Sequence, residues 1–338
     1  MRAVKKMIGL AVIAIALAGS TMSISSAQTL TGAGSTFVNP IMTQWIADYG
    51  KQTSVSINYQ PIGSGGGINA LINHTVDFAG SDVPMNSNEL AQASAPVYHI
   101  PDVVGAVTVA YNIPGIGPGI RLTGSVLADI YLGKITMWND PKITSLNPGV
   151  NFPSDSIFVT HRSDGSGTTA IFTDYLCKVS PEWKSGPGTG KSVDWPIGLG
   201  GKGNSGVAGL LKTHKDSIGY IELAYSVQND IFYAKLDNSS GKTIYPSVES
   251  AADAAKGVEV SPELTASITD SPNPNAYPIT GYSYLIVYKK PTQNADALKK
   301  FLAFIVTDGQ SEKYTKPLFY AHVPESVCKK ALAEIDSL

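Results

Sequence analysis

Residues 53–82 read TSVSINYQPIGSGGGINALINHTVDFAGSD. Apolar and polar residues alternate over 55–59, which predicts a β-strand, and the glycine-rich turn at 63–67 follows soon after it. The apolar residues of 68–72 then recur at helical spacing, and residues 76–78 predict a second strand. A strand, a helix and a strand in this order form a right-handed βαβ unit, so the segment predicts an α/β protein with parallel sheets.

The same alternation of strands and helices extends along the rest of the chain. A helix is expected over 39–50, and the continuous apolar run at 103–111 is typical of a buried parallel strand. The elements expected farther on are a helix at 166–178, strands at 218–225 and 284–288, and helices at 294–305 and 324–335. No internal repeat or low-complexity linker divides the chain, so we expect two lobes connected by strands rather than two domains in tandem.

The composition is that of a folded, globular protein. Its 338 residues are enough for about two domains, and an apolar fraction of 43% is too high for a disordered chain. Lys and Arg number 25 against 27 Asp and Glu. Because nucleic-acid binding needs a strong basic excess to displace counterions from phosphates, this balance argues against a nucleic-acid partner.

The first 27 residues have the pattern of a cleaved signal peptide. Basic residues precede an apolar run at 7–18, and a short polar stretch ends in small residues at Ala27, after which we expect cleavage. The run is too short to span a bilayer comfortably, so a membrane anchor or a buried helix is the weaker interpretation. No cysteine lies near the cleavage site, which indicates export to the periplasm or the medium without a lipid anchor. Removal of the three basic residues changes the formal net charge from −2 to −5.

Cysteine and histidine are too few and too scattered to predict a metal site. The two cysteines, Cys177 and Cys328, could pair in an oxidising compartment, although two free thiols buried in helices are the favoured interpretation. The five histidines show no ligand spacing. We therefore expect neither a metal nor another cofactor.

Glycines and small polar residues recur where predicted strands give way to helices. These stretches are 32–37 (GAGSTF), 63–67 (GSGGG), 81–82 (SD) and 162–168 (RSDGSGT). The carboxyl ends of parallel strands meet at one edge of a sheet, and free N–H groups at helix starts attract anions there. With Arg162 four residues before Ser166, the stretches together predict a cage for a small oxyanion. Ordinary turns and helix caps are the alternative interpretation of any single stretch.

Two other motifs have a more ordinary interpretation. Residues 198–203 match the dinucleotide pattern G-x-G-x-x-G, but the expected strand and helix do not flank them in register, so we predict a surface loop. Ser166 and His161 suggest a nucleophile and its base. However, the G-x-S-x-G elbow of hydrolases is missing from the sequence, and His161 precedes Arg162 in a predicted strand, where neighbouring side chains point to opposite faces.

Taken together, the motifs resemble the periplasmic phosphate-binding proteins of phosphate-specific (Pst) ABC transporters. The matching stretches are 31–37, 62–67, 76–82, 129–135, 162–168, 195–203 and 277–279. They follow in order through essentially the whole mature chain. Val38, where the family commonly has proline, and the two cysteines depart from the family pattern.

The resemblance implies a two-lobed fold of the periplasmic-binding-protein type. The first lobe would be discontinuous, formed by residues 28–110 and 277–338, and residues 111–276 would form the second lobe. Each lobe would be a mostly parallel sheet flanked by helices. Strand crossovers would join the lobes at a hinge.

The resemblance also implies a site for inorganic phosphate. The implied phosphate-binding residues are Thr36, Phe37, Ser64, Asp82, Arg162, Ser166, Gly167 and Thr168. Asp164 would orient Arg162 from behind, and Asp82 would accept a hydrogen bond from the ligand. Because a carboxylate repels an anion that brings no proton, and phosphate is protonated near neutral pH whereas sulfate is not, Asp82 predicts a preference for phosphate.

The implied function is high-affinity phosphate binding outside the cytoplasm and delivery to a membrane-embedded ABC permease for import. The protein would be a monomeric periplasmic receptor and not an enzyme. Two alternatives stay open, namely a receptor for another oxyanion such as sulfate or a phosphonate, and a secreted phosphatase-like hydrolase. The hydrolase would need a nucleophile, a base or a metal cluster that the sequence does not display. A sensing or adhesion role is compatible with the same residues.

Overall fold

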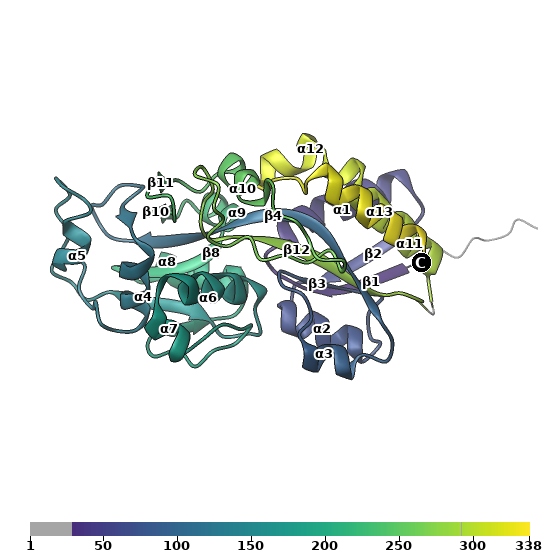
Figure 1. The fold of residues 1–338 in the computed structure, drawn as a ribbon, viewed down its shortest axis with the longest axis horizontal. Coiled ribbons are helices and arrows are strands. Elements are labelled where there is room, and N and C mark those ends of the chain that lie inside the picture. Colours follow the sequence, from purple (N-terminus) through teal and green to yellow (C-terminus); the bar gives the residue numbers. More distant parts are fainter. Residues whose placement is uncertain (1–28, 292) are drawn as a thin grey trace, which may run out of the picture.

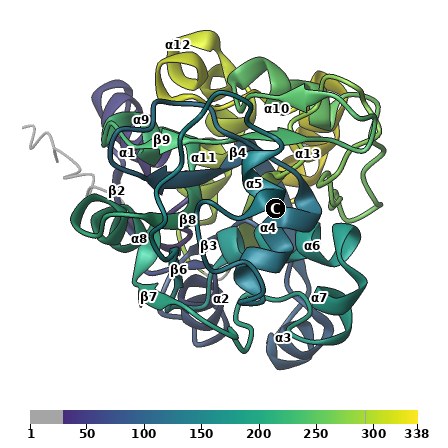
Figure 2. The same cartoon turned by 90° about the vertical axis from the view of Figure 1, so that its left-hand side faces the viewer.

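Two lobes lie side by side along the long axis of the molecule (Figure 1). The computed structural model describes residues 29–291 and 293–338, so the predicted signal peptide lies outside the described residues. One lobe holds the first strands together with the C-terminal helices, and the other holds the middle of the chain. Figure 2 views the second lobe end-on, with α4 (Gly124–Tyr131) and α5 (Pro141–Thr144) in front. The predicted two-lobed α/β architecture is confirmed.

A nine-stranded sheet runs through both lobes. Its path is β2-β1-β3-β12-β4-β8-β6-β7, and β9 also pairs with β4. Its strands are β1 (Thr29–Gly34), β2 (Ser56–Gln60), β3 (Phe78–Ser81), β4 (Val97–Asn112), β6 (Phe158–Arg162), β7 (Leu199–Gly201), β8 (Ser217–Glu222), β9 (Phe232–Tyr233) and β12 (Thr280–Tyr288). A three-stranded sheet in the order β11-β10-β5 is formed by β5 (Arg121–Leu122), β10 (Lys235–Asp237) and β11 (Thr243–Ile244).

Two long antiparallel strands, β4 and β12, join two sets of parallel strands. In one lobe β1 pairs in parallel with β2 and β3, and in the other β6 pairs in parallel with β7 and β8. Residues 97–106 of β4 pair with β12, whereas residues 107–112 of the same strand pair with β8. Both strands are buried along nearly their whole length, as the apolar run at 103–111 predicts. The expectation that this run forms a parallel strand is wrong, because β4 pairs antiparallel with β12, β8 and β9, and burial on both faces gives the same apolar run in either direction.

A β-bulge interrupts the pairing of β4 with β12. Ser283 lies opposite Val103, but the next residue, Tyr284, lies opposite Pro101, so Asp102 has no counterpart on β12. Proline lacks the N–H that a central strand requires and is confined to edges and bulges, which accounts for the irregularity at Pro101. The bulge places an acidic residue in the middle of the sheet.

Helices cover both faces of the sheet in the first lobe (Figure 1). The helices α1 (Asn39–Gln52), α11 (Ala295–Val306), α12 (Glu312–Thr315) and α13 (Glu325–Asp336) lie on one face, and α2 (Ser64–Ile72) and α3 (Ser87–Gln92) lie on the other. Tyr49 of α1 contacts Phe301 of α11 with ring centroids 5.2 Å apart, and Phe301 in turn contacts Phe78 of β3. The apolar faces of the helices thus bury the sheet.

Aromatic packing also organises the second lobe, whose remaining helices are α6 (Gly167–Val179), α7 (Pro181–Ser185), α8 (Gly203–Thr213), α9 (Leu223–Gln228) and α10 (Val248–Ala255). Phe172 of α6 stacks on Tyr220 of β8 at 4.3 Å, and Tyr131 of α4 packs edge-on against Phe172 at 4.9 Å. This contact fixes α6 on the sheet, and the start of α6 therefore has a defined position between the lobes.

The structure differs from the sequence-based expectations at three further places. The strand expected over 218–225 ends at Glu222 as β8, and residues 223–225 begin α9. Residues 198–203, predicted to form a surface loop, contain the short strand β7 and the start of α8. The strand was missed because it has three residues, two of them glycine, and so carries no apolar alternation. Cys177 and Cys328 are free thiols, as expected, but both are partly rather than fully buried. In the described ranges no helix is long and apolar enough to cross a membrane.

Candidate functional site

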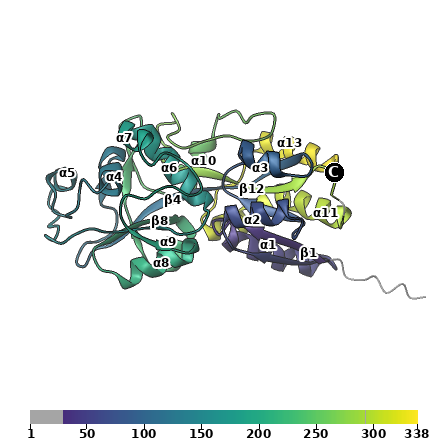
Figure 3. The same ribbon diagram turned by 90° about the horizontal axis from the view of Figure 1, so that it is seen from below.

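Four helices begin where the two lobes meet. From the first lobe these are α1 and α2, which follow β1 and β2, and from the second lobe they are α6 and α8, which follow β6 and β7. Figure 3 shows α2 and α6 facing each other across the middle of the molecule. Helix N-termini carry N–H groups without intrahelical partners, so this junction favours an anion.

Glycine is required where α2 begins. Gly63 has a φ of +90°, and its N–H donates to the carbonyl oxygen of Gly34 at 2.7 Å. Gly67 lies against the end of β1, where a Cβ atom would stand 2.4 Å from the carbonyl oxygen of Ala33. The glycine run therefore allows α2 to start in contact with β1, and it brings Ser64 to the junction between the lobes.

Arg162 is a fully enclosed cation at the end of β6, with its side chain 1% exposed. Its Nε donates to Asp164 Oδ1 at 2.8 Å and its Nη2 donates to Asp164 Oδ2 at 2.5 Å, a bidentate pair that fixes the plane of the guanidinium group. The remaining terminal nitrogen, Nη1, donates to Thr168 Oγ1 at 3.2 Å. Burial opposes ionisation of Asp164, but the hydrogen bonds and the charge of Arg162, together with backbone donors such as the Gly203 N–H, outweigh burial and lower the pKa of that carboxyl group.

Asp82 is the acidic counterpart of Arg162, 3% exposed, at the end of β3. Its Oδ1 accepts a short hydrogen bond from Ser35 and another from Ser283 at 3.3 Å, and its Oδ2 accepts from Thr168 at 3.5 Å. Burial raises the pKa of Asp82 to about 6, although the Ser35 hydroxyl and the charge of Arg162 act in the opposite direction. Asp82 is therefore ionised, and able to accept hydrogen bonds, above about this pH.

The two lobes are in direct contact through their helix starts. The Gly167 N–H of α6 donates to Ser64 Oγ of α2 at 3.1 Å, and the Gly65 N–H donates to the carbonyl oxygen of Gly165 at 2.9 Å. Ser64 Oγ also accepts from the N–H of Asp82 at 3.3 Å. The structure is thus a closed arrangement in which both lobes surround Asp82 and Arg162.

A further contact between the lobes connects α8 with the start of α1. The amide Nδ2 of Asn204 donates to Thr36 Oγ1 at 2.9 Å and to Thr168 Oγ1 at 3.3 Å, and the Asn204 N–H also donates to Thr36 Oγ1. Close by in the chain, the Phe37 N–H donates to Ser35 Oγ at 2.9 Å. The buried Asn204 therefore holds Thr36 and Thr168 together.

Proteins of known family align with nearly the whole chain. A model of the PBP superfamily domain matches residues 20–309. A phosphate-binding protein PstS of Xylella fastidiosa (strain 9a5c) is 44% identical over 319 residues, 92% of this chain and 87% of the relative. A PstS of Methanocaldococcus jannaschii is 36% identical over 332 residues, 90% of this chain and 85% of the relative. The chain belongs to the PstS family.

Solved structures support the same fold. A high affinity periplasmic phosphate-binding protein bound with phosphate superposes with a TM-score of 0.74 at 20% identity, covering 90% of this chain and 93% of that chain. An ABC-type phosphate transport receptor from Vibrio cholerae has a TM-score of 0.55 at 19% identity, covering 86% and 99%. At these identities the likeness concerns the fold alone, which these structures share with this chain.

Nearly all the residues implied by the PstS resemblance lie in one hydrogen-bonded network. Those joined by hydrogen bonds directly or through Ser35 and Asn204 are Thr36, Phe37, Ser64, Asp82, Arg162, Asp164, Gly167 and Thr168. Ser166 has a different part, since its Oγ caps α6 by accepting from the N–H of Thr169 at 3.0 Å. The network draws on both lobes.

Sequence reasoning missed three polar residues that contact this network. Ser35 lies within the quoted motif 31–37, and its position two residues before Phe37 is a detectable signal for a side-chain to backbone turn. Asn204 follows the stretch that was taken for a surface loop. Ser283 lies within the buried strand β12, where a lone serine carries no sequence signal of a site.

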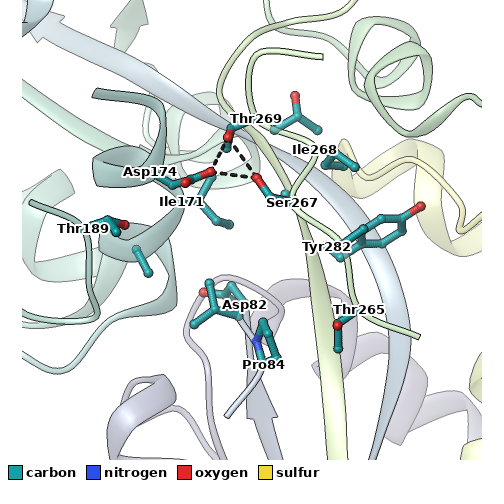
Figure 4. A pocket seen from close by; sticks show the side chains of 15 residues that line it. Asp82, Pro84, Ile171, Asp174, Thr189, Thr265, Ser267, Ile268, Thr269 and Tyr282 are labelled. Atoms are coloured by element: carbon teal, nitrogen blue, oxygen red, sulfur yellow. Dashed lines mark hydrogen bonds between the residues drawn. The ribbon is translucent and has the colours of Figure 1, made fainter. Parts of the chain in front are cut away.

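A pocket of about 280 Å³ opens beside Asp82 between the lobes. Figure 4 shows Asp82 and Pro84 on one side of it and Ile171 on another, while Asp174, Ser267 and Thr269 form a hydrogen-bonded group opposite Asp82. Within residues 29–291 and 293–338, no group of three or more His, Cys, Asp or Glu side chains could hold a metal ion.

Proposed function

We propose that this chain is a periplasmic receptor that binds inorganic phosphate between its lobes and delivers it to an ABC permease. The observation that carries the proposal is the enclosure of one cation, Arg162, and of Asp82, a carboxyl group that forms no ion pair in the described residues, in a single network at four helix starts. Such a site offers many donors and one acceptor, which matches a small oxyanion that keeps a proton. The PstS relatives and the phosphate-bound structural neighbour are phosphate-binding proteins by name.

The donors of the site come from backbone and side chains of both lobes. The proposed ligands of phosphate are Thr36, Phe37, Ser64, Asp82, Arg162, Ser166, Gly167 and Thr168, with Asp164 orienting Arg162. Most are neutral N–H and O–H groups, so the site does not depend on the net charge of the protein, which is negative. Local dipoles of helix starts supply much of the attraction for the dianion.

Asp82 is the proposed determinant of selectivity between oxyanions. Because it is ionised above about pH 6, it can accept a hydrogen bond from a protonated phosphate oxygen. Sulfate has no such proton, and its oxygens would face the carboxylate without a hydrogen bond in a buried site. A receptor for sulfate is therefore disfavoured, because a site built around one ligand hydrogen rejects analogues that lack it.

The hinge is proposed to lie in β4 and β12. We divide the chain into a first lobe of residues 28–110 and 277–338 and a second lobe of residues 111–276. The division is supported by the change of pairing partner within β4, from β12 to β8 at Ala106 and Val107. Bending of these strands would separate the helix starts and release the ligand.

A receptor is favoured over a hydrolase. His161 shares β6 with Arg162, and its ring stacks on Trp195 at 4.8 Å, while the Ser166 hydroxyl caps α6, so the two do not form a nucleophile and base. Periplasmic location and cleavage after Ala27 rest on the sequence of residues 1–27. The monomeric state belongs to the same proposal.

The decisive experiment is calorimetric titration of the mature protein with phosphate and sulfate, at about pH 5 and about pH 8, on either side of the pKa of Asp82. We expect phosphate to bind far more tightly than sulfate at the higher pH, and Asp82→Asn to narrow the ratio by about tenfold or more. An unchanged ratio in the variant would refute the role of Asp82. Turnover of a chromogenic phosphate ester by the wild type would revive the hydrolase.

A further inference from the structure

The glycine-rich segment 198–203 has no role in phosphate binding as proposed above, but it brings a buried asparagine to the site. At Gly201, where β7 ends, a Cβ atom would stand 2.6 Å from the backbone of α8. Gly203, the first residue of α8, has a φ of +71°, and its N–H donates to Asp164 Oδ1 at 2.9 Å. These glycines allow α8 to begin directly beside Asp164, and the next residue of the helix, Asn204, is 0% exposed.

The neighbours of Asn204 determine which way its side-chain amide is turned. Its Oδ1 accepts from the backbone N–H of Glu222 at 3.0 Å, and because an N–H can only donate, the oxygen must lie on this side. The two hydrogens of Nδ2 are therefore directed to the other side, to Thr36 Oγ1 at 2.9 Å and to Thr168 Oγ1 at 3.3 Å. The Asn204 N–H donates to Thr36 Oγ1 as well, at 3.2 Å. Toward both threonines Asn204 is purely a donor.

These bonds determine where the two threonine hydroxyls can direct their hydrogens. A hydroxyl group has one hydrogen to donate and two lone pairs with which to accept. Thr36 Oγ1 accepts twice from Asn204, and Thr168 Oγ1 accepts from Asn204 and, at 3.2 Å, from Arg162 Nη1. With both lone pairs engaged, each hydroxyl can act only as a donor. The Thr168 hydrogen has a long contact of 3.5 Å with Asp82 Oδ2, which is weak enough for it to turn to another acceptor.

Thr36 is also held through its backbone by the second lobe. It lies between β1 and α1 of the first lobe, and its carbonyl oxygen accepts from the hydroxyl of Tyr225 in α9 at 2.7 Å. Main chain and side chain of Thr36 are thus both bound by donors of the second lobe. In the closed arrangement these contacts leave the Thr36 hydroxyl little freedom to turn, and Asn204 determines its direction.

We propose that Asn204 is a positioning residue of the phosphate site: it occupies the lone pairs of Thr36 and Thr168 and so commits both hydroxyl hydrogens to the bound anion. The proposal rests on the phosphate-binding function proposed above. An anion without a free proton can only accept from these two hydroxyls, and Asp82 then remains the acceptor for the one proton that phosphate keeps. Donors that are oriented before the ligand arrives need not be ordered when it binds, so the affinity is higher.

The test separates this role from simple packing by changing Thr36 in two ways. Thr36→Val keeps the branched shape of threonine but removes the hydroxyl, whereas Thr36→Ser keeps the hydroxyl and removes a methyl group. Asn204→Ala is made in the wild type and in each of these two backgrounds. All the proteins are titrated calorimetrically with inorganic phosphate at one pH above the pKa of Asp82.

We expect Asn204→Ala to weaken phosphate binding about tenfold in the wild type and about tenfold again in the Thr36→Ser background, because both keep the hydroxyl that Asn204 orients. In the Thr36→Val background the further loss should be at most about threefold, through Thr168 alone. Asn204→Asp keeps the shape of the side chain and an acceptor for the Glu222 N–H. Its carboxylate would accept from the threonines instead of donating, so it should weaken binding at least about a hundredfold.

The matched control is Asn147→Ala in the second lobe. Asn147 is also a buried asparagine, and its Oδ1 accepts from the N–H of Arg121 at 2.7 Å while its Nδ2 donates to two backbone carbonyl oxygens at 2.9 Å. It follows α5, which Figure 1 shows at the end of the molecule far from the first lobe. Thermal unfolding should show a loss of stability in both alanine variants, but Asn147→Ala should bind phosphate like the wild type.

The results distinguish failure of the inference from failure of the proposed function. If the wild type does not bind phosphate, both fall together. If the wild type binds phosphate and Asn204→Ala binds it equally tightly, the inference alone is overturned. The same holds if Asn204→Ala causes equal losses in the Thr36→Val and Thr36→Ser backgrounds, because the effect would then not pass through the hydroxyl. Should Asn204→Ala fail to fold, Asn204→Asp decides, and wild-type affinity in that variant overturns the inference.

Discussion

Gly167 lies where the two lobes are in contact, and no space is left there for a side chain. A Cβ atom there would stand 2.6 Å from both Asp82 Oδ2 and Ser64 Oγ. We therefore expect Gly167→Ala to lower phosphate affinity by at least tenfold, because α6 can no longer approach α2, while the helix itself tolerates alanine. The measurement is a calorimetric titration with phosphate.

The matched control for this prediction is Gly209→Ala in α8. Apart from its chain neighbours and the backbone of its own helix, no described atom lies within 4 Å of the position of its Cβ, so the substitution should leave phosphate binding intact and stabilise the helix by up to about 1 kcal/mol. Equal affinities of the two variants for phosphate would contradict the tight fit at Gly167.

Asp82 should also affect the pH dependence of stability. Its pKa is about 6 in the folded protein against an ordinary value of 3.8, so the folded state keeps a proton in this window that the unfolded chain has lost. The free energy of unfolding contributed by Asp82 therefore falls as the pH rises through the window. Asparagine cannot ionise, so the Asp82→Asn variant lacks this pH-dependent loss. Its free energy of unfolding relative to that of the wild type should therefore rise by about 3 kcal/mol from about pH 4 to about pH 7, whatever constant difference the substitution adds.

Denaturant unfolding of the ligand-free proteins at these two pH values measures the effect of Asp82→Asn. A difference between variant and wild type that does not change with pH would show that Asp82 titrates normally. The comparison of one variant with the wild type removes the opposing contribution of His99, whose pKa burial lowers to about 4.

Residues of the site were predictable where a motif places them at a strand end. Arg162, Asp164 and Thr168 occupy one such stretch, and they contact one another in the structure. Asn204 and Ser283 were not predictable, because each becomes part of the site through a contact between segments far apart in the chain. Which segments meet depends on strand order, and local periodicity does not encode strand order.

Among the elements, α3 and the segment after α7 form a contact between the lobes outside the phosphate site. Lys191 Nζ lies 2.7 Å from Glu89 Oε2, and both side chains are only about 15% exposed. Because this pair joins the two lobes in the closed arrangement, Lys191→Met should speed phosphate release about fivefold, a loss of about 1 kcal/mol. Stopped-flow measurement of the release rate tests this, with selectivity over sulfate unchanged.

The control for the ion pair is Lys329→Met. Lys329 pairs with Glu325 within α13 and is exposed, so its loss should not alter the release rate. Methionine preserves the length of the side chain in both variants, and a similar acceleration in both would indicate an unspecific effect of removing a positive charge.

Helices and long strands were predicted well from periodicity, whereas short or irregular elements were not. The terminal helix predicted over 324–335 is α13, and the buried run at 103–111 lies within β4. The strand β7 escaped prediction because its glycines lack apolar side chains, and the bulge at Asp102 depends on how β4 is matched to β12. Such register is a property of two strands together.

For the whole molecule, removal of phosphate should open the lobes. The contacts of Gly65 with Gly165 and of Ser64 with Gly167 bind the lobes only in the closed arrangement, and the bound anion would add contacts to both sides. We expect the radius of gyration in small-angle scattering to fall when phosphate is added to the ligand-free protein. Gly167→Ala should keep the larger radius, and an identical radius of the wild type with and without phosphate would contradict the hinge.

The strand β4 contributes its first part to one lobe and its last part to the other, and it is buried along nearly its whole length. Unfolding of the sheet in either lobe would therefore disrupt β4, and the sheet of the other lobe also depends on this strand. Heating should melt the protein as one cooperative unit with a single endotherm, and a fragment cut at this strand should not fold as an autonomous domain.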